Sequence, residues 1–134
     1  MDSNQRAKKI KARGKAGEQY VCGYLRNKGY DIVCTNFSGR YGEIDVIAEN
    51  EKYIAFVEVK TRKQNSLVSG LESITEAKLK KVIRTAAEYL SKHNIDKQPR
   101  IDCVQLAVRD CDGEVIDMRY IENAVDDWSG YLKF

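Results

Sequence analysis

Four charged residues lie in two consecutive runs of the chain that are rich in strand-forming residues. Because side chains alternate along a strand, Glu43 and Asp45 share one face of the first run. For the same reason, Glu58 and Lys60 share one face of the second run. If the two runs pair, three carboxylates and one ammonium group gather on a single face of a sheet.

A polar segment separates the two runs and predicts a tight hairpin. The predicted turn is centred on Asn50 and Glu51. It places Glu43 opposite Glu58 and makes Asp45 the diagonal neighbour of Glu58, at about 7–8 Å between the backbones. At that separation the carboxylates of Asp45 and Glu58 could converge on one ion.

Three acids beside one lysine are unfavourable on paired strands unless a cation compensates their charge. A hard divalent ion such as Mg²⁺ or Mn²⁺ binds a few carboxylate oxygens and keeps several waters. Such an ion activates water and neutralises phosphate, as phosphodiester hydrolysis requires, and a nearby lysine can hold the water or stabilise the developing charge. The same charges could instead form a solvated hairpin edge, and the spacing alone leaves both interpretations open.

Histidine and cysteine chemistry is not expected. The only histidine, His93, ends an amphipathic helical stretch, where it interacts favourably with the helix dipole, so a Ser-His-Asp triad built on it is disfavoured. The four cysteines lack the paired spacing of a zinc site, and we expect reduced core or strand residues. They are Cys22, Cys34, Cys103 and Cys111.

The elements that would position these residues follow from hydrophobic periodicity. An apolar stripe predicts a helix over about residues 7–28, with Gly29 just beyond its end. A capping-box pattern at 73–76 predicts the start of a second helix that runs to about Lys92. Strands are predicted at 30–37, 43–48, 53–61, 100–108 and 115–121. The order αβββαββ predicts an α/β fold, in which a mixed β-sheet is flanked by helices and the second helix allows a parallel crossover.

The composition is typical of one globular domain. With 134 residues, of which 43% are hydrophobic and 32% charged, the chain can bury a core without disulfides or metal staples. The first residues lack the apolar core of a signal peptide, and no run approaches the ~18 apolar residues of a membrane span. We therefore expect a cytoplasmic protein without membrane contact.

Basic residues are concentrated near the N-terminus, although the net charge is only +3. The first fifteen residues include Arg6, Lys8, Lys9, Lys11, Arg13 and Lys15. This basic arm could follow the phosphates of a nucleic acid, or it could be a solvated helix start. The same two alternatives hold for the basic residues of the predicted second helix, which are Lys78, Lys80, Lys81 and Arg84.

Three motifs resemble the YraN family of uncharacterised, predicted endonuclease-like proteins. They are Gly17-Glu18, Gly42-Glu43-Ile44-Asp45 and Phe56-Val57-Glu58-Val59-Lys60-Thr61-Arg62. The match continues through Thr75, Lys78, residues 100–102 and residues 121–124. It covers about residues 14–125, which we take as a nuclease-like domain between the basic arm at 1–13 and a C-terminal tail at 126–134.

That family resembles archaeal Holliday-junction resolvases and other PD-(D/E)xK nucleases, which have a restriction-endonuclease-like core. The resemblance implies that Asp45 and Glu58 bind Mg²⁺ or Mn²⁺. It also implies that Glu18 is a metal ligand or orients water, and that Lys60 is the catalytic lysine. Glu43 is a further candidate ligand that is specific to the narrower family.

The implied function is a metal-dependent endonuclease that acts on DNA, with branched DNA and a homodimer suggested by the resolvases. Ile44 stands where the superfamily has a proline, at a position that supplies no chemistry. The alternative is a non-catalytic nucleic-acid-binding or assembly protein that retains the nuclease fold, because a fold does not fix an activity. The intact acidic set favours the enzyme.

Overall fold

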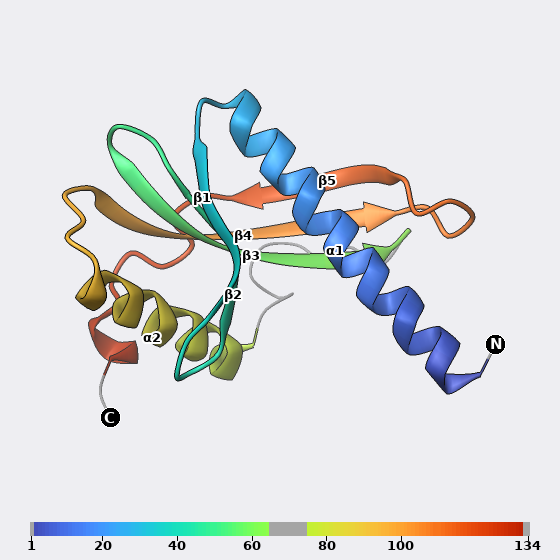
Figure 1. The fold of residues 1–134 in the computed structure, drawn as a ribbon, viewed down its shortest axis with the longest axis horizontal. Coiled ribbons are helices and arrows are strands. Elements are labelled where there is room, and N and C mark those ends of the chain that lie inside the picture. The colour runs from blue at the N-terminus through green and yellow to red at the C-terminus, as the bar shows by residue number, and fades with distance from the viewer. Residues whose placement is uncertain (1, 65–74, 133–134) are drawn as a thin grey trace.

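The computed structural model describes residues 2–64 and 75–132 (Figure 1). Its helices are α1 (Ser3–Asn27), α2 (Glu76–Lys92) and the short 3-10 helix η2 (Ser129–Tyr131). Its strands are β1 (Asp31–Ser38), β2 (Glu43–Glu49), β3 (Tyr53–Lys63), β4 (Gln98–Val108) and β5 (Val115–Ile121). The predicted αβββαββ order and α/β class are confirmed.

The five strands form one mixed sheet in the order β1-β2-β3-β4-β5. Strands β3 and β4 are parallel, whereas every other neighbouring pair is antiparallel. The chain passes through α2 between the two parallel strands, which is the crossover that the sequence predicts.

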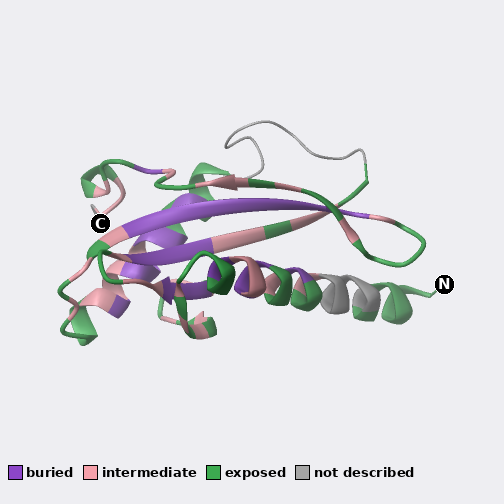
Figure 2. Cartoon of the chain, turned by 90° about the horizontal axis from the view of Figure 1, so that it is seen from above, coloured by how far each residue is buried: buried purple, intermediate pink, exposed green. Residues whose placement is uncertain are grey.

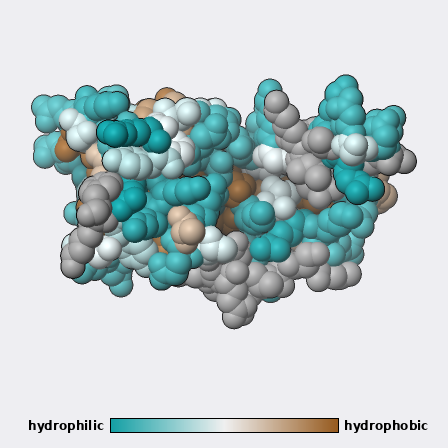
Figure 3. Space-filling model, turned by 90° about the horizontal axis from the view of Figure 1, so that it is seen from below, coloured by the Kyte–Doolittle hydropathy of each residue, from teal (hydrophilic) through white to brown (hydrophobic). Residues whose placement is uncertain are grey.

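Two hydrophobic clusters lie on opposite faces of this sheet. Residues of α2 pack on one face, against Ile54 and Phe56 of β3. Residues of α1 pack on the other, against Ala55 and Val57. Figure 2 shows that the longest buried stretches lie in the strands of the sheet. By contrast, most of the surface that faces the viewer in Figure 3 is hydrophilic.

Helix α1 begins earlier than predicted because its start is capped. Asp2 Oδ1 accepts a hydrogen bond from the Gln5 backbone N–H at 2.8 Å, and Gln5 Oε1 accepts one from the Asp2 N–H at 3.0 Å. Residues 3–13 of the predicted basic arm therefore belong to the first turns of α1. At the other end, Gly29 has φ +91°, as expected just beyond a helix end.

The predicted register of the β2–β3 hairpin is wrong by two residues. Ile47 pairs with Phe56 rather than with Ile54. The turn forms one residue later than expected, because Asn50 Oδ1 accepts hydrogen bonds from the backbone N–H groups of Lys52 and Tyr53, at 2.9 and 2.8 Å. A shift of two residues preserves which side chains share a face.

Strict alternation along β2 also fails at its first residues. Val46 and Ala48 pack on the α1 side of the sheet, but Ile44, predicted to share their face, packs on the α2 side. The change occurs next to Asn36 of β1, whose φ is +53°, a left-handed conformation that locally alters the direction of side chains.

Helix α2 begins two residues later than the predicted capping box. Thr75 is its N-cap, and Thr75 Oγ1 accepts a hydrogen bond from the Lys78 backbone N–H at 3.1 Å. Ser73, the predicted first residue of the box, lies outside the described residues. The helix ends at Lys92, as predicted, and His93 is its C-cap.

Trp128, Tyr131 and Leu132 of the C-terminal tail pack against the α2 side of the core, where Trp128 makes an edge contact with Phe56 at 6.4 Å between ring centroids. All four cysteines are free thiols. Cys111 lies exposed in the turn between β4 and β5, so its predicted core or strand position is wrong. Within residues 2–64 and 75–132, no helix is long and apolar enough to cross a membrane.

Candidate active site

A cavity of about 370 Å³ lies between β2, β3, β4 and the start of α2. It contains three of the residues that the sequence predicts for the site and adds one cation from α2. Its lining residues are Asp45, Glu58, Val59, Lys60, Thr75, Lys78, Cys103 and Val104. We call it the acidic pocket.

Asp45 is positioned by the end of the β2–β3 ladder. The last paired residues of the two strands are Val46 and Val57, and beyond them β2 and β3 no longer pair. The N–H of Val59 donates instead to Asp45 Oδ2, at 2.7 Å. The Asp45 carboxylate thus replaces a backbone acceptor and is fixed next to β3. Continued by one residue, the observed register would bring Asp45 opposite Glu58 rather than diagonal to it, and the two carboxyls share a hydrogen bond.

Glu58 lies at the centre of the acidic pocket and is almost enclosed. Its side chain is 13% exposed, and its Oε1 lies 3.4 Å from Lys78 Nζ. Its other oxygen, Oε2, is buried and accepts no hydrogen bond from an N–H or hydroxyl donor among the described residues, and the only side-chain hydrogen bond that Glu58 makes besides the one with Lys78 is shared with the Asp45 carboxyl. A buried carboxylate oxygen without such a donor is costly, so this position favours a proton or a cation.

Both facing carboxyls favour the protonated form more than free acids do. Burial raises the pKa of Glu58 to about 7, and the negative charge of Asp45 adds to the shift, whereas Lys78 opposes it. Burial also raises the pKa of Asp45, against the lowering effect of the Val59 hydrogen bond. Two acids that share one buried site cannot both ionise freely.

The strand pattern alone would suggest that Lys60 is the cation beside Glu58. The cation that contacts Glu58 is instead Lys78. Lys60 lines the acidic pocket but its side chain is exposed. Lys78 lies in the first turn of α2, just after the cap made by Thr75. From the sequence alone, Lys78 could be either a phosphate contact or a solvated residue, because only the packing of α2 on the sheet brings it to β3.

Glu18 and Glu43 lie outside the acidic pocket. Glu18 is half-buried on α1 and lines a separate cavity with Asn36. Its pKa is raised mainly by burial, against a hydrogen bond with Asn36, and the charges of Asp45 and Glu43 raise it further. Glu43 is exposed at the start of β2. Among the described residues, no group of three His, Cys, Asp or Glu side chains is arranged to hold a metal ion.

The lack of a side chain at Gly17 lets α1 approach the strands, which brings Glu18 close to them. A Cβ added at Gly17 would overlap Thr61 Oγ1 and would lie 3.2 Å from Leu106 Cδ1. A side chain there would push α1 away from β3, so glycine permits the close helix–strand contact. The Gly17-Glu18 motif therefore combines a packing residue with a charged neighbour.

The model of "Uncharacterised protein family UPF0102" matches residues 17–106. The chain belongs to this family. This confirms the resemblance to the YraN family, an uncharacterised family that is predicted to be endonuclease-like.

Three UPF0102 proteins illustrate the similarity. The one from Sulfurihydrogenibium sp. (strain YO3AOP1) is 41% identical over 95 residues, which cover 70% of this chain and 83% of that protein. The one from Dichelobacter nodosus is 42% identical over 90 residues, covering 67% and 71%. The one from Legionella pneumophila (strain Philadelphia 1) is 36% identical over 116 residues, covering 85% and 94%.

The donor set of this UPF0102 chain fits a hard divalent cation. Asp45 and Glu58 present carboxylate oxygens to the same pocket, and one of those oxygens is buried without an N–H or hydroxyl donor among the described residues. Oxygen ligands are those that Mg²⁺ and Mn²⁺ prefer. Two protein carboxylates leave further coordination positions for water and phosphate oxygens, which is typical of Mg²⁺ sites that act on phosphates.

Proposed function

We propose that this UPF0102 protein is a Mg²⁺- or Mn²⁺-dependent endonuclease that hydrolyses phosphodiester bonds in DNA. The observation that carries the proposal is the pair of facing carboxyls, Asp45 and Glu58, whose negative charge only Lys78 opposes at close range among the described contacts. A purely structural pair would be expected to have matched partners. An uncompensated pair in a cavity is typical of a functional site.

Asp45 and Glu58 would hold the ion between β2 and β3. A bound divalent ion supplies the positive charge that lowers the pKa of a water and neutralises a phosphate. Asp45 is held rigidly for this role by the Val59 N–H, at 2.7 Å. Glu58 would contribute its buried Oε2, while its Oε1 remains next to Lys78.

Lys78 and Lys60 would have different roles in the proposed reaction. Lys78 compensates part of the charge of Glu58 and keeps that side chain oriented. Lys60 lies on the exposed side of the acidic pocket, where its ammonium group can reach an entering phosphate and stabilise the charge that develops on it. Glu18 and Glu43 would act from a distance, by adding negative charge that favours cation binding.

The test is a cleavage panel with linear duplex, single-stranded, flapped and four-way-junction DNA, each with Mg²⁺, Mn²⁺ or EDTA. We expect cleavage that requires the metal, and the resemblance to the resolvases makes the junction the first substrate to examine. Asp45→Asn should lose at least ~100-fold in rate, because it removes charge while it keeps the shape of the side chain.

The matched control is Glu122→Gln, which removes an exposed acid outside the acidic pocket. It should cleave like the wild type. If Asp45→Asn cleaves at the wild-type rate, the site assignment is wrong. If the wild type binds DNA and cleaves none of the substrates, the non-catalytic nucleic-acid-binding alternative is the better interpretation.

A further inference from the structure

Arg62, near the end of β3, is partly buried and has no polar partner among the described residues. Its Nε is buried and donates to no acceptor there. The ion pairs between described residues do not include it either. A buried guanidinium N–H without an acceptor is costly, because it has lost its contact with water and made no bond in exchange. Arg62 therefore favours an anion that comes from outside the chain.

The side chain of Arg62 lies on the same face of the sheet as the acidic pocket. Strand β3 pairs with β4 without a bulge up to its last residue, so its side chains alternate throughout. Thr61 lies on the other face, where its Oγ1 would overlap a Cβ at Gly17 of α1. Arg62 thus follows Glu58 and Lys60, which line the acidic pocket, along one face of β3.

The neighbouring strands supply no acid to Arg62. Its partner on β4 is Ala107, and the next residue across the sheet is Asp117 of β5. Asp117 lies two strands away, at about 10 Å between the backbones. Its Oδ1 accepts from the Met118 N–H, at 2.9 Å. On the other side of β3, pairing with β2 ends at Val57. The strands of the sheet therefore leave the positive charge of Arg62 uncompensated.

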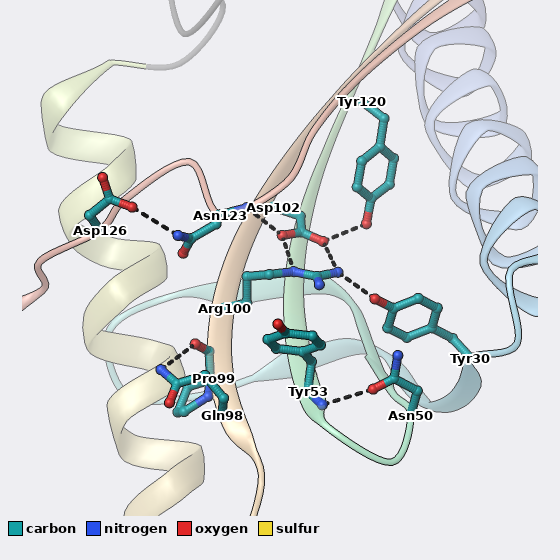
Figure 4. Close-up of polar contacts among 10 residues, drawn as sticks. All are labelled: Tyr30, Asn50, Tyr53, Gln98, Pro99, Arg100, Asp102, Tyr120, Asn123 and Asp126. Atoms are coloured by element: carbon teal, nitrogen blue, oxygen red, sulfur yellow. Dashed lines mark hydrogen bonds and ion pairs between the residues drawn. The ribbon is translucent and has the colours of Figure 1, made fainter.

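Arg100 illustrates which ligand satisfies this side of a guanidinium (Figure 4). Its Nε and Nη2 donate to the two oxygens of the Asp102 carboxylate, at 2.8 and 2.9 Å. This planar fork matches an anion that presents two oxygens on one atom. A phosphodiester presents two such oxygens, and it is the group on which the acidic pocket would act. The unpartnered Nε of Arg62 therefore favours a phosphate, bound through the same kind of fork.

Arg62 lies too far along β3 to contact an ion that Glu58 holds. Four residues separate them, which is about 13 Å between Cα atoms at a rise of ~3.3 Å per residue. Lys60 lies halfway between the two. A DNA strand whose phosphate enters the acidic pocket extends beyond it on both sides. Arg62 can therefore contact a phosphate next to the one at the ion.

We propose that Arg62 binds a phosphate of the DNA strand adjacent to the one that enters the acidic pocket. It makes a bidentate contact through Nε and one Nη, which positions the strand and takes no part in bond cleavage. Because phosphate contacts carry no sequence information, this contact adds affinity without a base preference. The inference rests on the proposed function and assigns a substrate-binding residue to it.

The experiment measures duplex DNA binding without cleavage, by fluorescence anisotropy in EDTA over a range of salt concentrations. Arg62→Gln should weaken binding at low salt roughly 10- to 100-fold, as expected for the loss of a charged hydrogen-bonded contact. It should also flatten the log–log salt dependence by ~0.9, the contribution of one phosphate contact. Arg62→Lys should keep the slope, because it keeps the charge, but bind more weakly than the wild type, because an ammonium group lacks the fork.

Lys52→Gln is the matched control, because it removes one exposed positive charge from the turn at the other end of β3. It should leave the slope unchanged. Urea unfolding separates binding from a structural role. Arg62 has no partner among the described residues to lose, so Arg62→Gln should be at least as stable as the wild type. A loss of stability with an unchanged salt slope would make Arg62 a structural residue and overturn the inference.

The outcomes for Arg62 and for the acidic pocket are distinguishable. If the wild type cleaves DNA and Arg62→Gln binds it with the wild-type slope, the inference fails and the proposed function stands. If the wild type cleaves no substrate but its salt slope depends on Arg62, the phosphate contact stands and the nuclease activity fails. If the wild type does not bind DNA, both fail together.

Discussion

Two buried carboxylate regions of this protein have opposite electrostatic character. On β4, Asp102 is fully buried, and each of its oxygens is matched by donors (Figure 4). Asp102 Oδ1 accepts from Arg100 Nε and the Asn123 N–H, at 2.8 and 3.0 Å. Asp102 Oδ2 accepts from Arg100 Nη2 and the Tyr120 hydroxyl, at 2.9 and 2.6 Å. In the acidic pocket, by contrast, two carboxyls face each other and share a hydrogen bond, and one oxygen of Glu58 accepts from no N–H or hydroxyl donor among the described residues.

The difference distinguishes a network that stabilises the fold from a pocket that could bind a ligand. The Asp102 region ties β4 to the chain after β5 and to Tyr30, whose hydroxyl accepts from Arg100 Nη2 at 2.7 Å. The guanidinium of Arg100 also lies over the ring of Tyr53, with 4.9 Å between Cζ and the ring centroid. Such a satisfied network holds elements together and needs no ligand. The acidic pocket holds unbalanced charge that a proton or a cation would relieve.

The largest expected contrast is in stability. Asp102→Ala should lower the free energy of unfolding by about 3–5 kcal/mol, because it leaves Arg100 buried without its charged partner. Asp45→Asn should leave that free energy unchanged or raise it, since it relieves repulsion with Glu58. Urea unfolding followed by circular dichroism measures both. Equal losses in the two variants would show that the acidic pocket is as structural as the Asp102 network.

The second contrast is in pH dependence. The pKa of Glu58 in the folded protein is about 7, above the usual value of 4.5, so the native state binds the proton more tightly than the unfolded state. Its contribution to stability is complete below about pH 4.5 and is lost as the pH rises through about 7, by roughly 3 kcal/mol. Glu58→Gln should remove this fall, which urea unfolding at several pH values would detect. A wild-type fall that persists in Glu58→Gln would assign it to another group.

The smallest contrast is between the two lysines. Lys78→Ala should raise the pKa of Glu58 further and cost less than about 1 kcal/mol of stability at about pH 8, because Lys78 is half exposed. Lys60→Ala should leave stability unchanged, because its side chain is exposed. Urea unfolding of both variants at that pH provides the comparison. A larger loss in Lys60→Ala would mean that Lys60 is the cation that balances the acids.

Much of the fold could be predicted because it depends on local patterns. The apolar stripe of α2 and the strand-rich runs determine the αβββαββ order, and Gly29 marks the end of α1. The shared face of Asp45, Glu58 and Lys60 was also predictable, since a period of two residues survives an error of two in the register.

The details of the acidic pocket depend on tertiary contacts that no local pattern encodes. The side chain of Asn50 moves the turn and thereby the partner of each β2 residue. The packing of α2 brings Lys78 to Glu58, which lies twenty residues earlier in the chain. Ile44 packs on the α2 side of the sheet, against the strict alternation that the sequence pattern predicts. In each case the local sequence is compatible with more than one arrangement, and the tertiary structure decides between them.

The most direct test of the acidic pocket as a metal site is Mn²⁺ binding measured by isothermal titration calorimetry in buffers of different ionisation enthalpy. Because Glu58 has a pKa of about 7, its carboxyl carries a proton in most protein molecules at about pH 6 and in few at about pH 8. We expect Mn²⁺ to displace about one proton per ion at the lower pH and close to none at the higher pH, with binding lost in Asp45→Asn and Glu58→Gln. Binding that releases no proton at about pH 6, or that persists unchanged in both variants, would contradict the assignment of the ion to Asp45 and Glu58.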